Sequence, residues 1–237
     1  MKPYIICHML QSIDGRIDCA MTEKIDDTEH YYEVLDKLEC DATIEGKTTL
    51  VMHYAEPGTF NTTKPYEAAG KQVYKATEAD AYAIGVDTKG TLLWGDDVES
   101  QFGRPLIMIL SEDASKEYLG YLQSKGISYI TTGRGSIDLA DAVSILSEKF
   151  GVKRLAVVGG GHLNGSFLDL GLIDEISMMY ASGVDAREGF AASFDGRSQD
   201  REPIRLNLNS VEQLDDIIWA RYTIKNSTFA FAQVDEV

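Results

Sequence analysis

The sequence predicts an α/β fold in which a mostly parallel central sheet carries helices on both faces and ends in antiparallel strands. Two observations support this prediction. From residue 127 to residue 171, apolar strand segments alternate with helical segments of roughly 10–15 residues, which is typical of parallel strands joined by right-handed crossovers. After residue 171 the last two strand segments, 204–214 and 217–226, have no helix between them, which indicates an antiparallel edge.

The N-terminal segments fit the same pattern. Residues 4–10 form an apolar run of strand length, and residues 42–46 form a short strand that leads into a helix. Between these strands, Asp27 or Thr28 is suited to cap a helix. That helix places apolar side chains at helical spacing, namely Tyr31, Val34, Leu35 and Leu38.

The middle of the chain is less regular. Residues 53–80 contain two prolines, two glycines and many polar residues, and we predict a long surface loop or insertion with room for one short helix. A helix over 115–126 ends at Gly126, as glycine commonly ends a helix. Further strands are expected at 81–86, 91–94 and 105–110.

Composition excludes several classes of partner. The net charge of −16 argues against nucleic acid and against an anionic membrane surface, because both need a positive patch on the protein. No segment approaches the roughly 18 apolar residues of a membrane span, and the N-terminus does not resemble a signal peptide. The three cysteines form no CxxC pair, so we expect reduced thiols, no metal site and a cytoplasmic location.

Three consecutive glycines, Gly159 to Gly161, lie between an apolar strand and a helix. Two interpretations are open at this point. Glycines at the carboxyl end of a strand let the backbone approach a phosphate, whose charge is stabilised by the free N–H groups of the helix. Alternatively, the glycines only allow a tight turn. The spacing matches neither GxGxxG nor the Walker motif.

Longer motifs extend this comparison. Residues 157–182 read VVGGGHLNGSFLDLGLIDEISMMYAS. Four more segments, QSIDGRI, EGKTTL, GISYITTG and IIWARYTI, stand in the expected order at 11–17, 45–50, 126–133 and 217–224. Together they resemble the RibD C-terminal reductase domain family, which belongs to the dihydrofolate-reductase-like superfamily.

The resemblance implies a fold and an activity. It implies a three-layer dihydrofolate-reductase-like domain over residues 1–237 that forms a homodimer through its C-terminal strands. It also implies an NADPH-dependent reductase similar to the 5-amino-6-(5-phosphoribosylamino)uracil reductase of riboflavin biosynthesis, acting on a small pyrimidine- or pterin-like molecule. The alternatives are a non-catalytic nucleotide-binding protein on the same fold, or a related reductase with an unrelated substrate.

Cofactor contacts follow from the resemblance. They are expected along the glycine turn, at one further helix start and at two strand ends, namely at Lys47, Thr48, Ser111, Thr132, Gly133, Gly159, Gly160, Gly161, Leu163 and Asn164. Ser111 is equally suited to cap the helix that follows it. Arg134 and Ser111 favour the 2′-phosphate of NADPH, whereas Glu112 favours NADH, so NADPH is expected with NADH as the alternative.

Substrate contacts are expected in the loop after the first strand, at Ser12, Asp14, Gly15 and Arg16. Asp14 is the candidate catalytic residue, because its carboxyl group can bond a pyrimidine-like ring or deliver a proton. The alternative is that Asp14 only holds the Asp-Gly turn. Arg16 either pairs with a substrate phosphate or is solvated. Of the histidines, His8 is expected in the core, and His162 flanks the glycines.

Two positions depart from the family pattern. Val158 stands where a glutamate usually precedes the glycines, and the stretch VMHYAEPG replaces an Asp-Asp-Pro motif. Both acidic groups help to hold the substrate in that family, so these departures put the substrate in question. The deaminase pattern HxE…PCxxC is absent from the sequence, and we therefore expect a reductase without deaminase activity.

Overall fold

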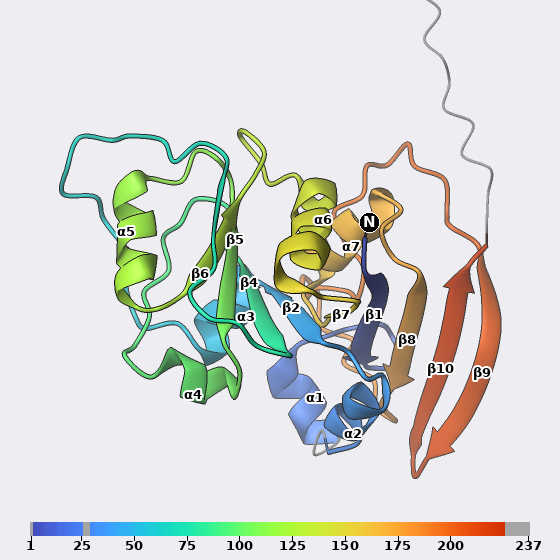
Figure 1. The fold of residues 1–237 in the computed structure, drawn as a ribbon. Coiled ribbons are helices and arrows are strands. Elements are labelled where there is room, and N and C mark those ends of the chain that lie inside the picture. Colours follow the sequence, from blue (N-terminus) through green and yellow to red (C-terminus); the bar gives the residue numbers. More distant parts are fainter. Residues whose placement is uncertain (1, 26–28, 226–237) are drawn as a thin grey trace, which may run out of the picture.

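Ten strands form one sheet in the computed structural model, which describes residues 2–25 and 29–225 (Figure 1). Their order across the sheet is β3-β6-β5-β4-β2-β7-β1-β8-β10-β9. The strands from β6 to β8 in this order run parallel, whereas β3 and the β9–β10 hairpin are antiparallel. The strands are β1 (Tyr4–Gln11), β2 (Ala42–Gly46), β3 (Gln72–Tyr74), β4 (Tyr82–Val86), β5 (Leu106–Leu110), β6 (Ser128–Thr131), β7 (Arg154–Val157), β8 (Glu175–Tyr180), β9 (Leu206–Leu214) and β10 (Ile217–Ile224).

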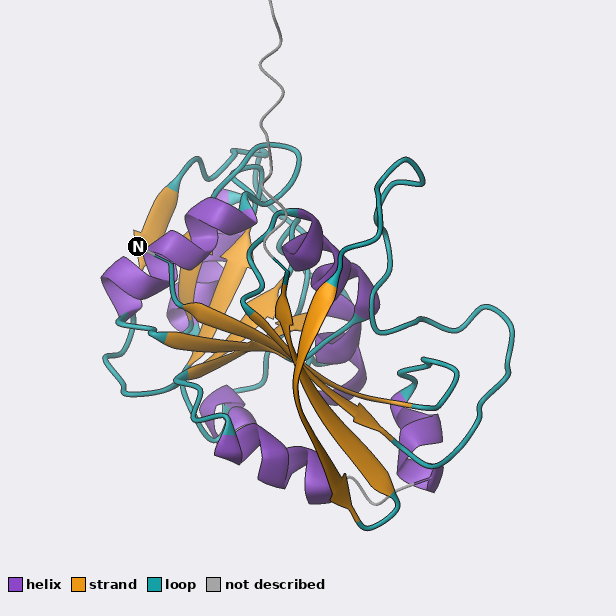
Figure 2. Ribbon diagram, turned by 90° about the vertical axis from the view of Figure 1, so that its right-hand side faces the viewer, coloured by secondary structure: helices purple, strands orange, loops and turns teal. Residues whose placement is uncertain are grey.

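Helices cover both faces of the sheet (Figure 2). Alternation along β1 shows why: Ile5 and Cys7 face the core under α6 and α7, while Ile6 and Leu10 face the core under α2. Leu50 of α3 and Tyr118 of α5 pack on the same side as α2, over the other half of the sheet. The helices are α1 (Cys19–Ile25), α2 (Glu29–Lys37), α3 (Lys47–His53), α4 (Val98–Phe102), α5 (Lys116–Ser124), α6 (Leu139–Phe150) and α7 (Gly161–Asp169).

The predicted fold class is confirmed, and the differences are local. Residues 91–94 do not form a strand: Leu93 makes only an isolated bridge to Glu56, because the backbone N–H groups of Thr91 and Leu92 are held by the side chain of Asp87. Residues 53–80 contain the end of α3 and the short strand β3 but no separate helix. The helices α1 and α4 were not predicted.

Three further expectations are resolved differently or lie outside the structure. Ser115, not Ser111, caps α5, where its side chain accepts a hydrogen bond from the Tyr118 N–H. Within the predicted antiparallel edge, β9 is the outer strand and covers residues 217–224 by pairing with them. The candidate caps Asp27 and Thr28 lie outside the described residues, and a single domain over 1–237 stays a prediction.

The segment after β8 folds back over α7 and holds that helix in place. The Asp195 N–H donates to the Gly161 carbonyl at 3.0 Å, and the Asn164 side-chain amide donates to the Ser193 carbonyl at 2.7 Å. Gly165 lies so close to this segment that a Cβ there would be 1.8 Å from the Asp195 carbonyl oxygen. The glycine therefore allows a backbone-to-backbone contact that no side chain would permit.

We expect Gly165→Ala to lower the free energy of unfolding by roughly 1–3 kcal/mol, because the added methyl group must displace the segment at Asp195. Urea unfolding measures the change. Gly120→Ala in α5 is the matched control: its Cβ meets nothing within 4 Å, so the better helix former should stabilise the protein by roughly 0.5–1 kcal/mol. Equal stability of the Gly165 variant and the wild type would contradict this reading of the contact.

Candidate active site

The glycine turn joins the end of β7 to the start of α7 and is tied to the neighbouring strand. The Gly46 N–H, at the end of β2, donates to the Gly159 carbonyl at 2.8 Å. Gly159 has a φ of +130°, a conformation that side chains rarely adopt. The Gly159–Gly160 peptide bond is cis. Because Gly46 is bonded to Gly159, the starts of α3 and α7 lie side by side at the carboxyl edge of the sheet.

A cavity of about 770 Å³ opens at this edge, and we call it the glycine-turn cavity. Its walls come from the segments that follow β2, β4, β6 and β7, together with parts of the loops after β1 and β8. The lining residues used below are Ile17, Lys47, Thr48, Thr49, Asp87, Thr88, Lys89, Gly160, Gly161, His162, Leu163, Phe190 and Ala191. Ligands bind parallel α/β sheets at the carboxyl ends of the strands, so the location matches the general rule.

Half of the predicted cofactor contacts meet in this cavity. Lys47, Thr48, Gly160, Gly161 and Leu163 line it. Lys47 donates to the Asp87 carboxylate at 2.9 Å and also to the Thr91 hydroxyl. The lysine is half-exposed while Asp87 is buried, so this pair fixes the lysine at the cavity wall.

The other predicted contacts lie outside the lining, and their roles stay predictions. Gly159 supplies the positive φ of the turn without lining the cavity, and Asn164 is buried and bonded to the Ser193 carbonyl. At the ends of β5 and β6, the Ser111 hydroxyl donates to the Thr88 carbonyl at 2.8 Å, and the Thr132 hydroxyl bonds to Asp141. Gly133, the last of the predicted cofactor contacts, accepts a hydrogen bond at its carbonyl from the Glu112 N–H.

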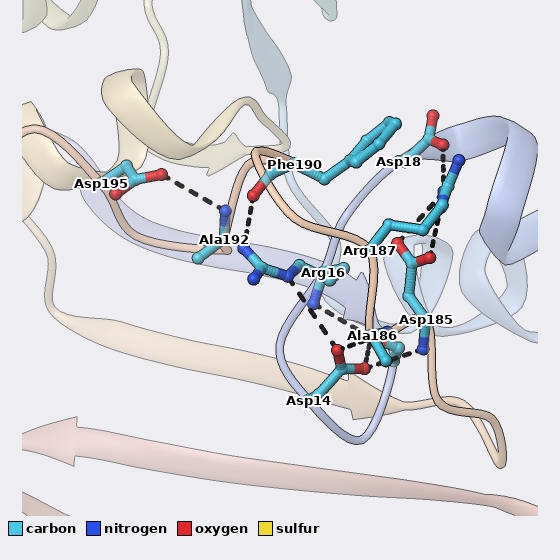
Figure 3. A network of polar contacts seen from close by, with 10 residues as sticks. Asp14, Arg16, Asp18, Asp185, Ala186, Arg187, Phe190, Ala192 and Asp195 are labelled. Atoms are coloured by element: carbon cyan, nitrogen blue, oxygen red, sulfur yellow. Dashed lines mark hydrogen bonds and ion pairs between the residues drawn. The ribbon is translucent and has the colours of Figure 1, made fainter.

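The loop after β1 is held by the carboxylate of Asp14 (Figure 3). Asp14 accepts hydrogen bonds from the backbone N–H groups of Asp185 at 3.0 Å and Ala186 at 2.9 Å, and from the Ser12 hydroxyl at 2.7 Å. The Ser12 hydroxyl, followed by the two N–H groups, holds the pKa of Asp14 well below its usual range. This geometry supports the turn-holding interpretation, and a catalytic role for Asp14 stays a prediction.

The other residues of this loop join it to the segment after β8 (Figure 3). The Arg16 guanidinium donates to the Phe190 carbonyl at 2.5 Å, and the Ile17 N–H donates to the Ala191 carbonyl at 3.3 Å. The Gly15 carbonyl accepts from the Ser193 N–H at 3.2 Å. Through these contacts, the two segments together form one wall of the glycine-turn cavity.

A second cavity of about 500 Å³ lies on the face of the sheet that α2 and α3 cover, and we call it the Glu45 cavity. It shares Ile17 and Thr49 with the glycine-turn cavity, so the two adjoin. Glu45 Oε2 is buried and has no hydrogen-bond partner among the described residues. Burial raises the pKa of Glu45 to about 7, against the attraction of Arg104.

Sequence reasoning missed several residues of the two cavities. Glu45 had a detectable signal, since Thr43 and Glu45 alternate with apolar residues in the strand predicted at 42–46. Thr88 and Lys89 had none, because they follow a strand without any recognisable motif. His162 does line the cavity. His8 is buried in the core as expected; burial lowers its pKa to about 4, and its Nδ1 lies 3.0 Å from the Ser177 hydroxyl.

Comparison with known proteins identifies the family. The model of the RibD C-terminal domain matches residues 3–218, and the chain belongs to this family. The 2,5-diamino-6-ribosylamino-4(3H)-pyrimidinone 5′-phosphate reductase of Methanothermobacter thermautotrophicus is 26% identical over 234 residues, which cover 95% of this chain and 100% of that protein. The reductase of the same name from Archaeoglobus fulgidus is 26% identical over 183 residues, with 76% and 80% coverage.

Solved structures agree on the fold. A pyrimidine reductase-like protein from Corynebacterium diphtheriae has a TM-score of 0.70 at 16% identity, covering 95% of this chain and 93% of that one. The riboflavin biosynthesis reductase Rib7 of Saccharomyces cerevisiae has a TM-score of 0.57 at 17% identity, with 94% and 90% coverage. The predicted family, fold and enzyme class, an oxidoreductase, are confirmed, and a reductase of this family implies a nicotinamide cofactor. Within the described residues, no helix is both long and apolar enough to span a membrane.

We expect Glu45→Gln to stabilise the protein increasingly as pH rises. The folded pKa of Glu45, about 7, exceeds its ordinary value of 4.5, so the folded state binds this proton more tightly than the unfolded state and loses stability as pH climbs through 7. Glutamine does not ionise, so the free energy of unfolding of the variant should rise relative to that of the wild type by roughly 2 kcal/mol between about pH 5.5 and pH 8.

Urea unfolding at the two pH values measures this difference. Glu212→Gln, on the exposed face of β9, is the control and should show no pH-dependent gain. A Glu45 variant whose advantage is the same at both pH values would show that the carboxyl group is already ionised without cost.

Proposed function

We propose that the protein is an NADPH-dependent reductase that acts on a ribosylaminopyrimidinone 5′-phosphate, as the names of its archaeal relatives describe for them. The observation that carries the proposal is the adjoining pair of cavities. One lies at a glycine turn before a helix, the other contains the enclosed carboxyl oxygen of Glu45, and both include Ile17 and Thr49. A dinucleotide and a small heterocycle need this kind of shared boundary to react.

The glycine-turn cavity fits a dinucleotide. A Cβ at Gly160 would meet no protein atom within 4 Å, so this glycine leaves room on the cavity side. Gly160, Gly161 and Leu163 would lie against the diphosphate, whose charge the first N–H groups of α7 stabilise. Lys47 adds a positive charge at the start of α3. The reduced nicotinamide, when bound, supplies the hydride.

The protein's own part is to position the reactants and exclude water. The ladder between β2 and β7 fixes the distance between the starts of α3 and α7, and the paired loops at Ile17 and Ala191 form the wall over the cavity. Asp14 keeps these loops together as a carboxylate. Because its pKa lies below the usual range, we infer that Asp14 positions the loop and does not deliver the proton.

The charges of the cavity support NADPH over NADH. Asp87 follows β4, where an acidic residue that accepts the ribose hydroxyls would favour NADH. Its carboxylate is already occupied by Lys47 and by the N–H groups of Thr91 and Leu92. Lys89 lines the same cavity and supplies a positive charge for a 2′-phosphate. The predicted group Arg134 pairs instead with Glu112 at 3.3 Å.

Two further proposals concern the assembly and the location of the protein. A homodimer is supported by apolar side chains on the terminal hairpin, where Leu208, Val211 and Ile218 are 58%, 56% and 47% exposed. A cytoplasmic location stays a prediction from the cysteine content. The alternative of a nucleotide-binding protein without catalytic activity is addressed by the first experiment below.

Purified protein should oxidise NADPH, followed at 340 nm, when 2,5-diamino-6-ribosylamino-4(3H)-pyrimidinone 5′-phosphate is present. We expect NADPH to give a kcat/KM at least about tenfold above that of NADH, because the ion pair or hydrogen bonds to a 2′-phosphate contribute on the order of 1.5–3 kcal/mol. Binding of NADPH without turnover of this compound or of pterin and aminouracil analogues would favour the non-catalytic alternative. Absence of binding would reject both.

Gly160→Ala should weaken NADPH binding by about tenfold or more, because the methyl group would enter the space that the diphosphate needs. The backbone at Gly160 is extended and accepts alanine, so the unfolding free energy should change by less than about 1 kcal/mol. Fluorescence titration measures the affinity, with Gly120→Ala as the control. Unchanged affinity would place the cofactor elsewhere.

A further inference from the structure

Glu45 is a half-buried residue with one carboxyl oxygen that the fold encloses and leaves without a partner. Its Oε2 atom is enclosed and accepts no hydrogen bond from the described residues. Buried polar groups in proteins are nearly always satisfied, and an unpaired carboxylate is the costliest exception. Glu45 also lines a cavity of about 500 Å³, which is large enough for a heterocyclic ring. The arrangement indicates that a ligand supplies the missing hydrogen bonds.

The backbone fixes where this carboxyl group lies. Parallel pairing places Ile44 opposite Val157, and the Val158 N–H donates to the Ile44 carbonyl at 3.1 Å. Glu45 therefore lies beside Val158, and both side chains line the same cavity. One residue further on, Gly46 is bonded to the glycine turn. The carboxyl group stands next to the proposed cofactor site without being part of it.

The walls of the Glu45 cavity suit a flat and mostly uncharged ring. Its aromatic and apolar walls come from β1, α2, the residue after α3 and the end of α4, at Met9, Leu10, Tyr31, Tyr32, Leu35, Tyr54 and Phe102. Aromatic rings offer stacking surfaces to a planar ligand. The charged or titratable groups that line the cavity besides Glu45 and the tyrosines are Glu23, Asp36, His53 and Arg104.

We propose that the Glu45 cavity binds the aminopyrimidinone ring of the substrate, and that ionised Glu45 accepts hydrogen bonds from the ring's N–H groups. A carboxylate with a free oxygen is an acceptor only, and it matches a ring edge that carries neighbouring N–H donors. Thr49, in the first turn of α3, lies four residues after Glu45 and lines both cavities, so a ring held by Glu45 reaches toward the glycine turn. This inference rests on the proposed function.

If ionised Glu45 holds the ring, substrate affinity must depend on pH in one direction. Burial holds the pKa of the free Glu45 near 7, and a ring that donates N–H bonds binds the ionised form. Substrate affinity should therefore be full above pH 7 and fall as Glu45 takes up a proton below it. A proton donor would behave in the opposite way, with activity falling as pH rises through 7.

The test compares kcat and KM for wild type, Glu45→Gln and Glu45→Asp from about pH 5.5 to pH 8.5. We expect Glu45→Gln to raise the KM for the pyrimidinone roughly tenfold to a hundredfold at pH 8, with the KM for NADPH unchanged. The wild-type loss of affinity below pH 7 should disappear in Glu45→Gln and persist in Glu45→Asp. The substrate's own phosphate and the other residues of the cavity are the same in all three proteins, so the differences report Glu45.

The outcomes separate this inference from the proposed function. A pyrimidinone KM within twofold of wild type for Glu45→Gln overturns the inference. The inference is also overturned if the wild type loses activity as pH rises above 7 and Glu45→Gln removes that loss, since this is the behaviour of a proton donor. In both cases turnover by the wild type leaves the proposed function standing. If the wild type shows no turnover, the proposed function fails first. Glu212→Gln is the surface control, and should Glu45→Gln unfold, the Glu45→Asp profile alone decides between the two signs.

Discussion

The site depends on the close approach of β2 to the glycine turn that ends β7. One hydrogen bond, from the Gly46 N–H to the Gly159 carbonyl, joins the two strand ends where the parallel ladder stops. Because each strand runs directly into a helix, this bond also sets α3 against α7. The lysine of one helix start, the free N–H groups of the other and the carboxyl group of Glu45 are all placed by the same pair of neighbouring strands.

An acidic protein can bind an anionic cofactor because binding is decided locally. The chain carries a net charge of −16, yet the glycine-turn cavity contains two lysines and a helix N-terminus. Asp87, which also lines this cavity, is buried and shared between Lys47 and two backbone N–H groups. Its carboxylate therefore holds Lys47 at the cavity wall.

Most of the fold could be predicted from the sequence, because the strand and helix periods are clear in 127–180 and the last two predicted strands have no helix between them. The wrong strand prediction at 91–94 has a clear cause: this apolar run fills the core through Leu92 and Trp94, while Asp87 holds its backbone in a turn. Of the candidate site, the glycine turn and Lys47 were predictable from motifs. Lys89 and the unpaired state of Glu45 were not, because both depend on which segments meet in space.

The bonds of Asp14 to Asp185 and Ala186 couple two segments that are about 170 residues apart in sequence. Each segment supplies part of one wall, so neither can change length or direction without the other. Substrate specificity within this family should therefore diverge by joint replacement of both loops. A chimera that takes only one of the two loops from a relative would lack the matching hydrogen-bond partners between them.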